Sequence, residues 1–140
     1  PATPERLPDL MEQWFRFREQ DQSLIGSFVA HFYFVYVHPF CDGNGRTARI
    51  VNASSLYHAG WKKMKSLPLA NAINNEINGY YRSLEDSEYP LSDRTGKWLD
   101  LSPFVSYMLD VFEQCMIDTA LTRNELTTNE PTLLEQHLSL

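Results

Sequence analysis

SLIGSFVAHFYFVYV, residues 23–37, is the segment on which the fold class depends. Its valine, phenylalanine and tyrosine content favours a β-strand by propensity alone. Its spacing favours a helix, because apolar residues recur at every fourth position and do not alternate with polar ones. One series consists of Leu24, Phe28, Phe32 and Tyr36. A second apolar series lies beside it, so we predict a helix that is apolar around most of its circumference and therefore buried.

This central helix is expected to end near His38, because Pro39 disfavours helical geometry in the residue before it. The other periodic segments are helical too. They are 7–17, 45–60, 67–89 and 100–126. The first is expected to carry Leu10, Met11, Trp14 and Phe15 on one face, and the last to have Phe104, Met108, Val111, Phe112 and Cys115 on its inner side. We therefore predict one all-α domain, with a core at 1–126 and a tail at 127–140 that has room for one short helix.

Composition excludes several classes of protein. The chain has 140 residues and a formal charge of −6, which argues against a general affinity for nucleic acid or anionic membranes. Its longest apolar run is shorter than the roughly 20 residues that a membrane-spanning helix needs. Cys41 and Cys115 have no metal-type or redox-type spacing, which predicts a reducing, cytoplasmic location. Because the chain starts at Pro1 rather than Met, we expect it to be a fragment.

The segment HPFCDGNGRTAR, residues 38–49, concentrates reactive side chains directly after the central helix. Gly43 and Gly45 let the backbone turn tightly and expose its N–H groups. If the next helix begins near Gly45, its free N–H groups and positive dipole end form an anion site in the same turn. Arg46 and Arg49 lie three residues apart on that helix and reach the same side, which suits a polyphosphate.

The two remaining polar side chains of this segment add a metal ligand and a proton acceptor to the anion site. Asp42 is placed to hold Mg²⁺ against phosphate oxygens. His38 is the side chain whose ordinary pKa allows it to accept a proton near neutral pH. Each feature has a simpler interpretation alone: a loop, a helix cap or a solvated helix face. Those interpretations do not explain why all of them fall within twelve residues.

The segment resembles the signature of the Fic family (filamentation induced by cyclic AMP), His-x-Phe-x-Asp/Glu-Gly-Asn-Gly-Arg-x-x-Arg. All eight specified positions match, and they are His38, Phe40, Asp42, Gly43, Asn44, Gly45, Arg46 and Arg49. A more diffuse similarity covers nearly the whole chain. The resemblance implies an all-helical core whose motif loop joins two central helices, and an enzyme that transfers AMP from ATP to a protein hydroxyl. Relatives that transfer phosphate or phosphocholine depart from the Gly-Asn-Gly-Arg core, which is intact here.

The resemblance also implies a role for each motif residue. His38 is the general base, and Asp42 coordinates Mg²⁺ between the α- and β-phosphates. Phe40 anchors the loop in the core. The anion hole is formed by the backbone of Gly43, Asn44 and Gly45, and the β- and γ-phosphates are held by Arg46 and Arg49. Tyr80 or Tyr81 lies where the family lines its adenine pocket, although both tyrosines fit a core role equally well.

Two features of the family are absent from this sequence. A β-hairpin flap that aligns the target segment is expected upstream of residue 8. An inhibitory helix, whose Glu pairs with Arg49, is expected before Pro1; the alternatives are that an antitoxin-like partner supplies it or that the domain is unregulated. A protein target is implied, and self-association is left open.

Three alternative functions remain. The same loop is used by hydrolases that remove AMP, although the carboxylate they need to position water is not evident here. An inactive Fic-like binding module is the second. The third is a transition-metal site formed by His31, His38 and Asp42, which would leave the arginines and glycines unexplained.

Overall fold

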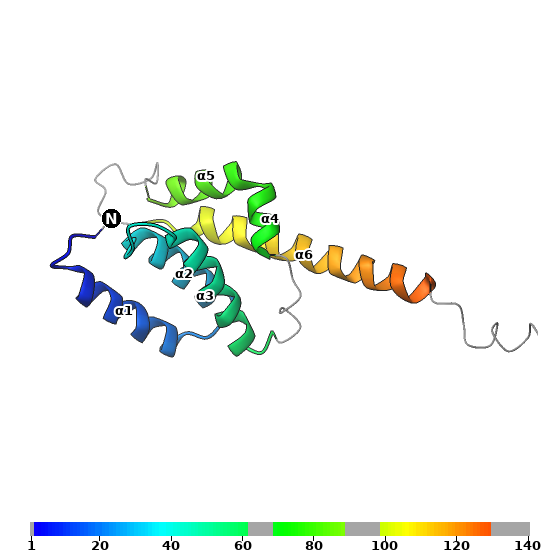
Figure 1. Ribbon diagram of the computed structural model, residues 1–140, viewed down its shortest axis with the longest axis horizontal. Coiled ribbons are helices and arrows are strands. Elements are labelled where there is room, and N and C mark those ends of the chain that lie inside the picture. Colours follow the sequence, from blue (N-terminus) through cyan, green and yellow to red (C-terminus); the bar gives the residue numbers. More distant parts are fainter. Residues whose placement is uncertain (1, 62–68, 89–98, 130–140) are drawn as a thin grey trace, which may run out of the picture.

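The computed structural model describes residues 2–61, 69–88 and 99–129, with side chains described as far as 122. Regular secondary structure in these ranges is entirely helical, which confirms the all-α prediction. The helices, labelled in Figure 1, are α1 (Leu7–Gln20), α2 (Leu24–Val37), α3 (Asn44–His58), α4 (Leu69–Asn75), α5 (Ile77–Glu88) and α6 (Ser102–Asn129). The predicted tail helix at 131–138 lies outside the described residues, and the division at residue 126 stays a prediction.

The helix α2 lies at the centre of the fold, in contact with α1, α3 and α6. It begins at Ser23, whose hydroxyl caps the helix by accepting a hydrogen bond from the Gly26 N–H at 2.9 Å. Most of its side chains are buried, as the sequence predicted. The indole N–H of Trp14 in α1 donates to the Ala30 carbonyl of α2 at 2.8 Å, so the two helices are joined by a buried polar contact as well as by packing.

The main core lies between α2 and the second half of the chain. Phe28 and Phe32 from α2 pack against Leu56, Ile73, Tyr80 and one face of α6. All five α6 residues predicted to face inward are buried: Phe104, Met108, Val111, Phe112 and Cys115. Figure 1 shows α5 lying along the first part of α6 and α4 crossing α6 at a steep angle, while the C-terminal part of α6 extends beyond the other helices. The N-terminal part of α6 therefore helps to hold the wall formed by α5 against α2.

Two predictions about the helices were wrong. The helix expected at 67–89 is divided at Glu76 into α4 and α5, which meet at a steep angle in Figure 1. Asn74 and Asn75 precede the bend and are poor helix formers, so the chain turns there at low cost. Phe15 was expected on the same face of the helix as Trp14, but Trp14 is buried and Phe15 is 54% exposed, with the two rings in a T-shaped contact.

Candidate active site

His38 ends α2 in a strained conformation that directs its ring to the protein surface. It has φ 55° and ψ 59°, the one positive φ among the described residues other than glycine. Its backbone N–H donates to the Phe34 carbonyl at 3.1 Å, which completes the last turn of the helix. Its ring Nδ1 lies 3.3 Å from the Val35 carbonyl oxygen. Because a carbonyl only accepts hydrogen bonds, this contact places the proton of the neutral ring on Nδ1 and leaves Nε2 with a free lone pair.

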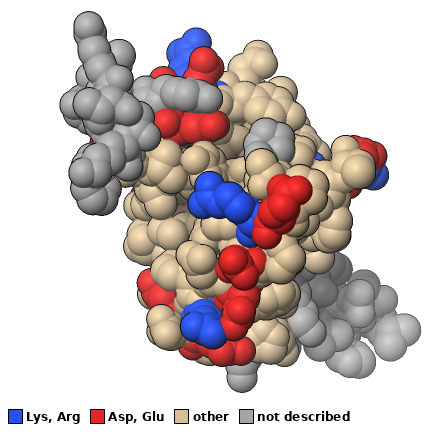
Figure 2. All heavy atoms as spheres, turned by 90° about the vertical axis from the view of Figure 1, so that its left-hand side faces the viewer, with Lys and Arg blue, Asp and Glu red and all other residues tan. Residues whose placement is uncertain are grey.

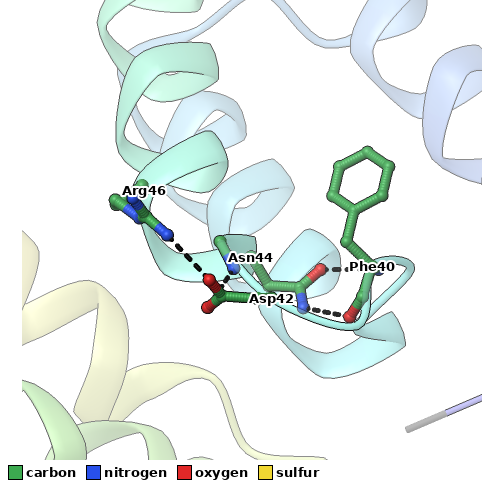
Figure 3. Close-up of polar contacts among 5 residues, drawn as sticks. Phe40, Asp42, Asn44 and Arg46 are labelled. Carbon is green, nitrogen blue, oxygen red and sulfur yellow. Dashed lines mark hydrogen bonds and ion pairs between the residues drawn. The ribbon is translucent and has the colours of Figure 1, made fainter.

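The loop between α2 and α3 is closed by the side chain of Asn44. This residue is 3% exposed, and its amide contacts both polar groups of the Phe40 main chain. The Phe40 N–H donates to Asn44 Oδ1 at 2.9 Å, and Asn44 Nδ2 donates to the Phe40 carbonyl at 2.6 Å (Figure 3). The motif had indicated a role for the backbone of Asn44 alone. Its side chain therefore has a structural function that the sequence pattern did not indicate.

The expectation that the ring of Phe40 is buried in the core was wrong. The residue is 50% exposed, and its ring centroid lies 6.0 Å from that of the buried Phe34. The ring lies over the end of α2 rather than within the core, because the αL turn at His38 and the following Pro39 carry the chain outward. Phe40 fixes the loop through its main chain, which Asn44 binds.

The start of α3 presents free N–H groups to the loop. Gly43 precedes the helix with φ 83°, a left-handed conformation that glycine adopts without strain. The first bond of the helix runs from the Thr47 N–H to the Gly43 carbonyl at 2.9 Å, so the N–H groups of Asn44, Gly45 and Arg46 lie outside the helical ladder. No side chain caps this end. The predicted anion-binding geometry is therefore present at the N-terminus of α3.

The free N–H groups of Asn44, Gly45 and Arg46 form a nest at the start of α3. The carboxylate of Asp42 lies at its edge. Its Oδ1 accepts from the Gly43 N–H at 2.6 Å, and its Oδ2 accepts from Arg46 Nη2 at 2.9 Å (Figure 3). Both side chains of the ion pair are well exposed, at 89% for Asp42 and 71% for Arg46. An exposed pair of this kind contributes about 1 kcal/mol or less. Either partner can therefore be drawn into new contacts with a ligand at little cost.

These groups surround one pocket of about 310 Å³. Its lining includes His38, Asp42, Gly43, Asn44, Gly45, Arg46, Arg49, Tyr80 and Tyr81, together with Val35, Cys41 and Leu84. The pocket thus brings side chains of α5 to the motif loop. Tyr80 is 2% exposed and belongs to the core, whereas Tyr81 is 62% exposed. Tyr80 therefore both lines the pocket and packs in the core, while Tyr81 lines the pocket without being part of the core.

The alternative prediction of a transition-metal site formed by His31, His38 and Asp42 is wrong. His31 is fully buried, and its Nε2 lies 3.0 Å from the Tyr80 hydroxyl oxygen. The described residues contain no group of three or more His, Cys, Asp or Glu side chains that could hold a metal ion. His31 lies within α2, whereas His38 follows the end of α2 at Val37 in a left-handed conformation and is exposed. His31 instead contacts Tyr80, which lines the pocket.

Surface charge agrees with a local anion site on an acidic protein. On the face that Figure 2 shows, Lys and Arg side chains lie beside Asp and Glu side chains rather than in a field of one sign. Helices long and apolar enough to cross a membrane do not occur in the described part of the chain.

The comparisons with known proteins agree with one another. The sequence profile of the Fic/DOC family matches residues 1–56, which contain α1, α2, the motif loop and most of α3. Over this segment the chain is similar to the Fic/DOC family. It is 27% identical over 140 residues to the protein adenylyltransferase Fic of Drosophila yakuba, and 26% identical over 143 residues to that of Culex quinquefasciatus. These alignments cover 96% and 99% of this chain, but the chain spans only about a quarter of the length of these relatives.

A solved structure extends the likeness beyond the motif. The crystal structure of a Fic family protein from Desulfovibrio desulfuricans G20 superposes with a TM-score of 0.72 at 30% sequence identity. The match covers 87% of this chain and 36% of that protein. The likeness in fold therefore extends beyond residues 1–56, the segment that the family profile matches.

Proposed function

We propose that this Fic domain transfers AMP from ATP to a Ser, Thr or Tyr hydroxyl of a target protein and releases pyrophosphate. The observation that carries the proposal is the pocket of about 310 Å³ that contains a histidine with a free Nε2, an unpartnered helix N-terminus and two arginines. The names of the insect relatives support ATP as the AMP donor and a protein as the acceptor.

His38 is the general base in this proposal. Its Nδ1 faces the Val35 carbonyl, so Nε2 is the atom that removes the proton from the target hydroxyl. The left-handed turn holds the ring at the end of a buried helix, which limits its freedom before the substrates arrive. The oxygen of the target then attacks the α-phosphorus in line with the departing pyrophosphate, and His38 carries the proton away.

The phosphates are bound by the start of α3. The N–H groups of Asn44 and Gly45 point to the negative charge that grows on the α-phosphate oxygens, and Arg46 and Arg49 bind the β- and γ-phosphates. Arg46 leaves Asp42 to do so, which costs little because their ion pair is exposed. Charge neutralisation and positioning therefore account for most of the expected rate enhancement.

Mg²⁺ fits this donor set. Asp42 is the one carboxylate among the described residues that line the pocket, and it is well exposed. Mg²⁺ commonly uses one or two carboxylates and completes its shell with phosphate oxygens and water, so a larger protein cage is not required. When bound, the ion would neutralise phosphate charge. Asp42 would hold it in exchange for the contacts that the carboxylate now makes with Gly43 and Arg46.

The target protein is expected to approach beside residue 2. The Ala2 N–H donates to the Val37 carbonyl at 3.0 Å, one residue before His38. In a longer chain, the residues that precede Ala2 would therefore start next to the catalytic side chain. This position suits the β-hairpin flap that the family resemblance implies, and a regulatory glutamate that pairs with Arg49 is expected in the flanking chain or on a partner.

The test is incubation with Mg²⁺, a cell lysate and ATP labelled with ³²P on either the α- or the γ-phosphate. Label on protein from α-labelled ATP alone supports AMP transfer, whereas label from γ-labelled ATP indicates phosphorylation. His38→Ala should lower the transfer rate by about 10²–10⁴-fold and leave ATP binding in place. His58→Ala, at the other end of α3, is the matched control and should label like the wild type.

Removal of AMP is the second candidate. It needs a carboxylate to position water, and the pocket offers only Asp42 among the described residues that line it. Because Asp42 is assigned to Mg²⁺, we place transfer first. Release of AMP from a pre-labelled target, without transfer in the forward assay, would reverse that order. Absence of both activities with ATP bound would instead favour the inactive binding module.

A further inference from the structure

His31 is a buried histidine that the proposed chemistry does not use. It lies in α2 two turns before His38, is 1% exposed, and packs between the rings of Phe104 and Tyr80. Its Nε2 lies 3.0 Å from the Tyr80 hydroxyl oxygen. Its Nδ1 is buried and has no partner in the described part of the chain. Burial, aided by the positive charge of Arg49, lowers its pKa to about 3, so the imidazole is neutral at physiological pH.

The direction of the hydrogen bond between His31 and Tyr80 follows from the unpartnered Nδ1. With the proton on Nδ1, the site would bury an N–H donor that has no acceptor, an arrangement that is rare in folded proteins. With the proton on Nε2, only a nitrogen lone pair is left unpaired, and Nε2 donates to the Tyr80 oxygen. The second arrangement is therefore favoured.

This direction determines what Tyr80 can do in the pocket. Its oxygen accepts from His31, so the hydroxyl proton remains to be donated, and the described residues provide no acceptor for it. Burial raises the pKa of Tyr80, so the group stays a hydroxyl and acts as a donor rather than as an anion. Tyr80 lines the same pocket as Arg49, whose charge acts on both Tyr80 and His31.

We propose that His31 is a positioning residue of this pocket: its neutral imidazole donates to Tyr80 and turns the Tyr80 hydroxyl proton toward a phosphate oxygen held by Arg49. The identity of the ligand as ATP rests on the proposed function. The direction of the hydrogen bond between His31 and Tyr80 does not depend on it. The donor set of Tyr80 and Arg49 fits a polyphosphate, because both groups donate and neither accepts from the ligand.

The first test needs no ligand. ¹⁵N NMR of histidine-labelled protein, with the His31 signal assigned by its loss in His31→Phe, should show protonated Nε2, bare Nδ1 and no titration between pH 8 and pH 5. A proton on Nδ1, or a charged ring in this range, would overturn the proposal. A buried histidine with a purely structural role would not require the Nε2–H form.

The second test is a double-mutant cycle on the affinity for Mg²⁺–ATP. Tyr80→Phe should weaken binding by about ten-fold, the value of a hydrogen bond to a charged group. His31→Phe should cause a similar loss, and the double variant should bind no worse than either single variant. Tyr107→Phe is the control, because its hydroxyl donates to the Glu76 carbonyl outside the pocket, and it should bind like the wild type.

Two further arms separate the possible failures. His31→Gln keeps an N–H donor near the position of Nε2 and should recover affinity to within about three-fold of the wild type. Losses from His31→Phe and Tyr80→Phe that multiply in the double variant would show that His31 does not act through Tyr80. The same cycle is run with pyrophosphate. Wild-type protein that binds pyrophosphate but not ATP would contradict the proposed function alone, and protein that binds neither would also overturn the phosphate contact.

Discussion

The amide of Asn44 binds both the N–H and the carbonyl of Phe40, at 2.9 and 2.6 Å, from a position that is 3% exposed. This pair of hydrogen bonds connects the first residue of α3 with the third residue after α2, which ends at Val37. The histidine and the N–H groups of the nest belong to different helices, so a short rigid link between those helices fixes their separation. Asn44 is therefore the residue that fixes the distance between His38 and the anion site.

Asn44→Ala should lower the free energy of unfolding by about 2–3 kcal/mol, because two hydrogen bonds are lost and the polar groups of Phe40 lose their partners. Urea denaturation with an unchanged m-value is the appropriate measurement. Asn74→Ala, at an exposed position of α4, is the control and should change stability by no more than about 0.5 kcal/mol. Equal effects of the two substitutions would show that the loop is not held by Asn44.

The two motif glycines should respond in opposite directions to the same substitution. Gly43→Ala places a side chain at φ 83° and should cost about 1–2 kcal/mol. Gly45 is inside α3, where an added Cβ would meet its nearest neighbour, Arg49 Nη1, at 3.7 Å, an ordinary contact. Gly45→Ala should therefore stabilise the protein by up to about 1 kcal/mol. Thermal denaturation of both variants decides the matter, and the same sign for both would contradict the assignment of Gly43 to the turn.

Most of the fold was predictable from the spacing of apolar residues. In 24–37 this spacing indicates a helix even though the residue types favour a strand. The spacing of apolar residues around most of the circumference of α2 identified it as the central helix. The break at Glu76 was not predictable in the same way, since asparagines lower helix stability without specifying a bend. For the site, the spacing of the motif was sufficient to place His38, Asp42 and the start of α3 around one pocket.

The contributions of His31 and the Asn44 side chain could not be inferred from that spacing. Each depends on a partner that tertiary structure provides: Tyr80 lies 49 residues after His31, and the Phe40 main chain approaches Asn44 only because the loop turns back. A buried polar residue in an apolar helix was the one available signal for His31. Such residues usually have a hydrogen-bond partner, but the sequence does not name it.

Stability should depend on the protonation of His31. Its pKa is about 3 in the folded protein and 6.5 when unperturbed, so below pH 6.5 the unfolded chain binds a proton that the folded protein does not. The stabilising contribution of the neutral ring is complete above pH 6.5 and decreases as the pH falls toward 3, with a slope of up to about 1.4 kcal/mol per pH unit. Urea denaturation between pH 7 and pH 5 measures it, before most carboxylates titrate.

His31→Phe is the matched variant for this pH series. It lacks the titrating group, so the difference in stability between wild type and variant should shift in favour of the variant as the pH falls. Other groups titrate equally in both proteins and cancel. Parallel curves for wild type and variant would mean that His31 is protonated equally in the folded and unfolded states.

Asp42→Asn should separate metal binding from stability. The ion pair that Asp42 forms with Arg46 is exposed, so its loss should change the free energy of unfolding by about 1 kcal/mol or less. ATP affinity is measured calorimetrically with Mg²⁺ and with EDTA. Wild-type protein should bind more tightly with Mg²⁺, and Asp42→Asn should lose that gain. Asp86→Asn, on the exposed side of α5 and outside the pocket, should retain it.

Cys41 provides a chemical probe of the same pocket. It is exposed and lines the pocket, whereas Cys115 is buried, and burial together with the charge of Asp118 raises the pKa of the Cys115 thiol. Native protein should therefore react with N-ethylmaleimide at one site, and denatured protein at two, as counted by intact-mass spectrometry. Saturating Mg²⁺–ATP should slow the native reaction, because the ligand and the adduct occupy the same space. Cys41→Ser should remove the fast adduct, and labelling that ATP does not slow would place the nucleotide outside this pocket.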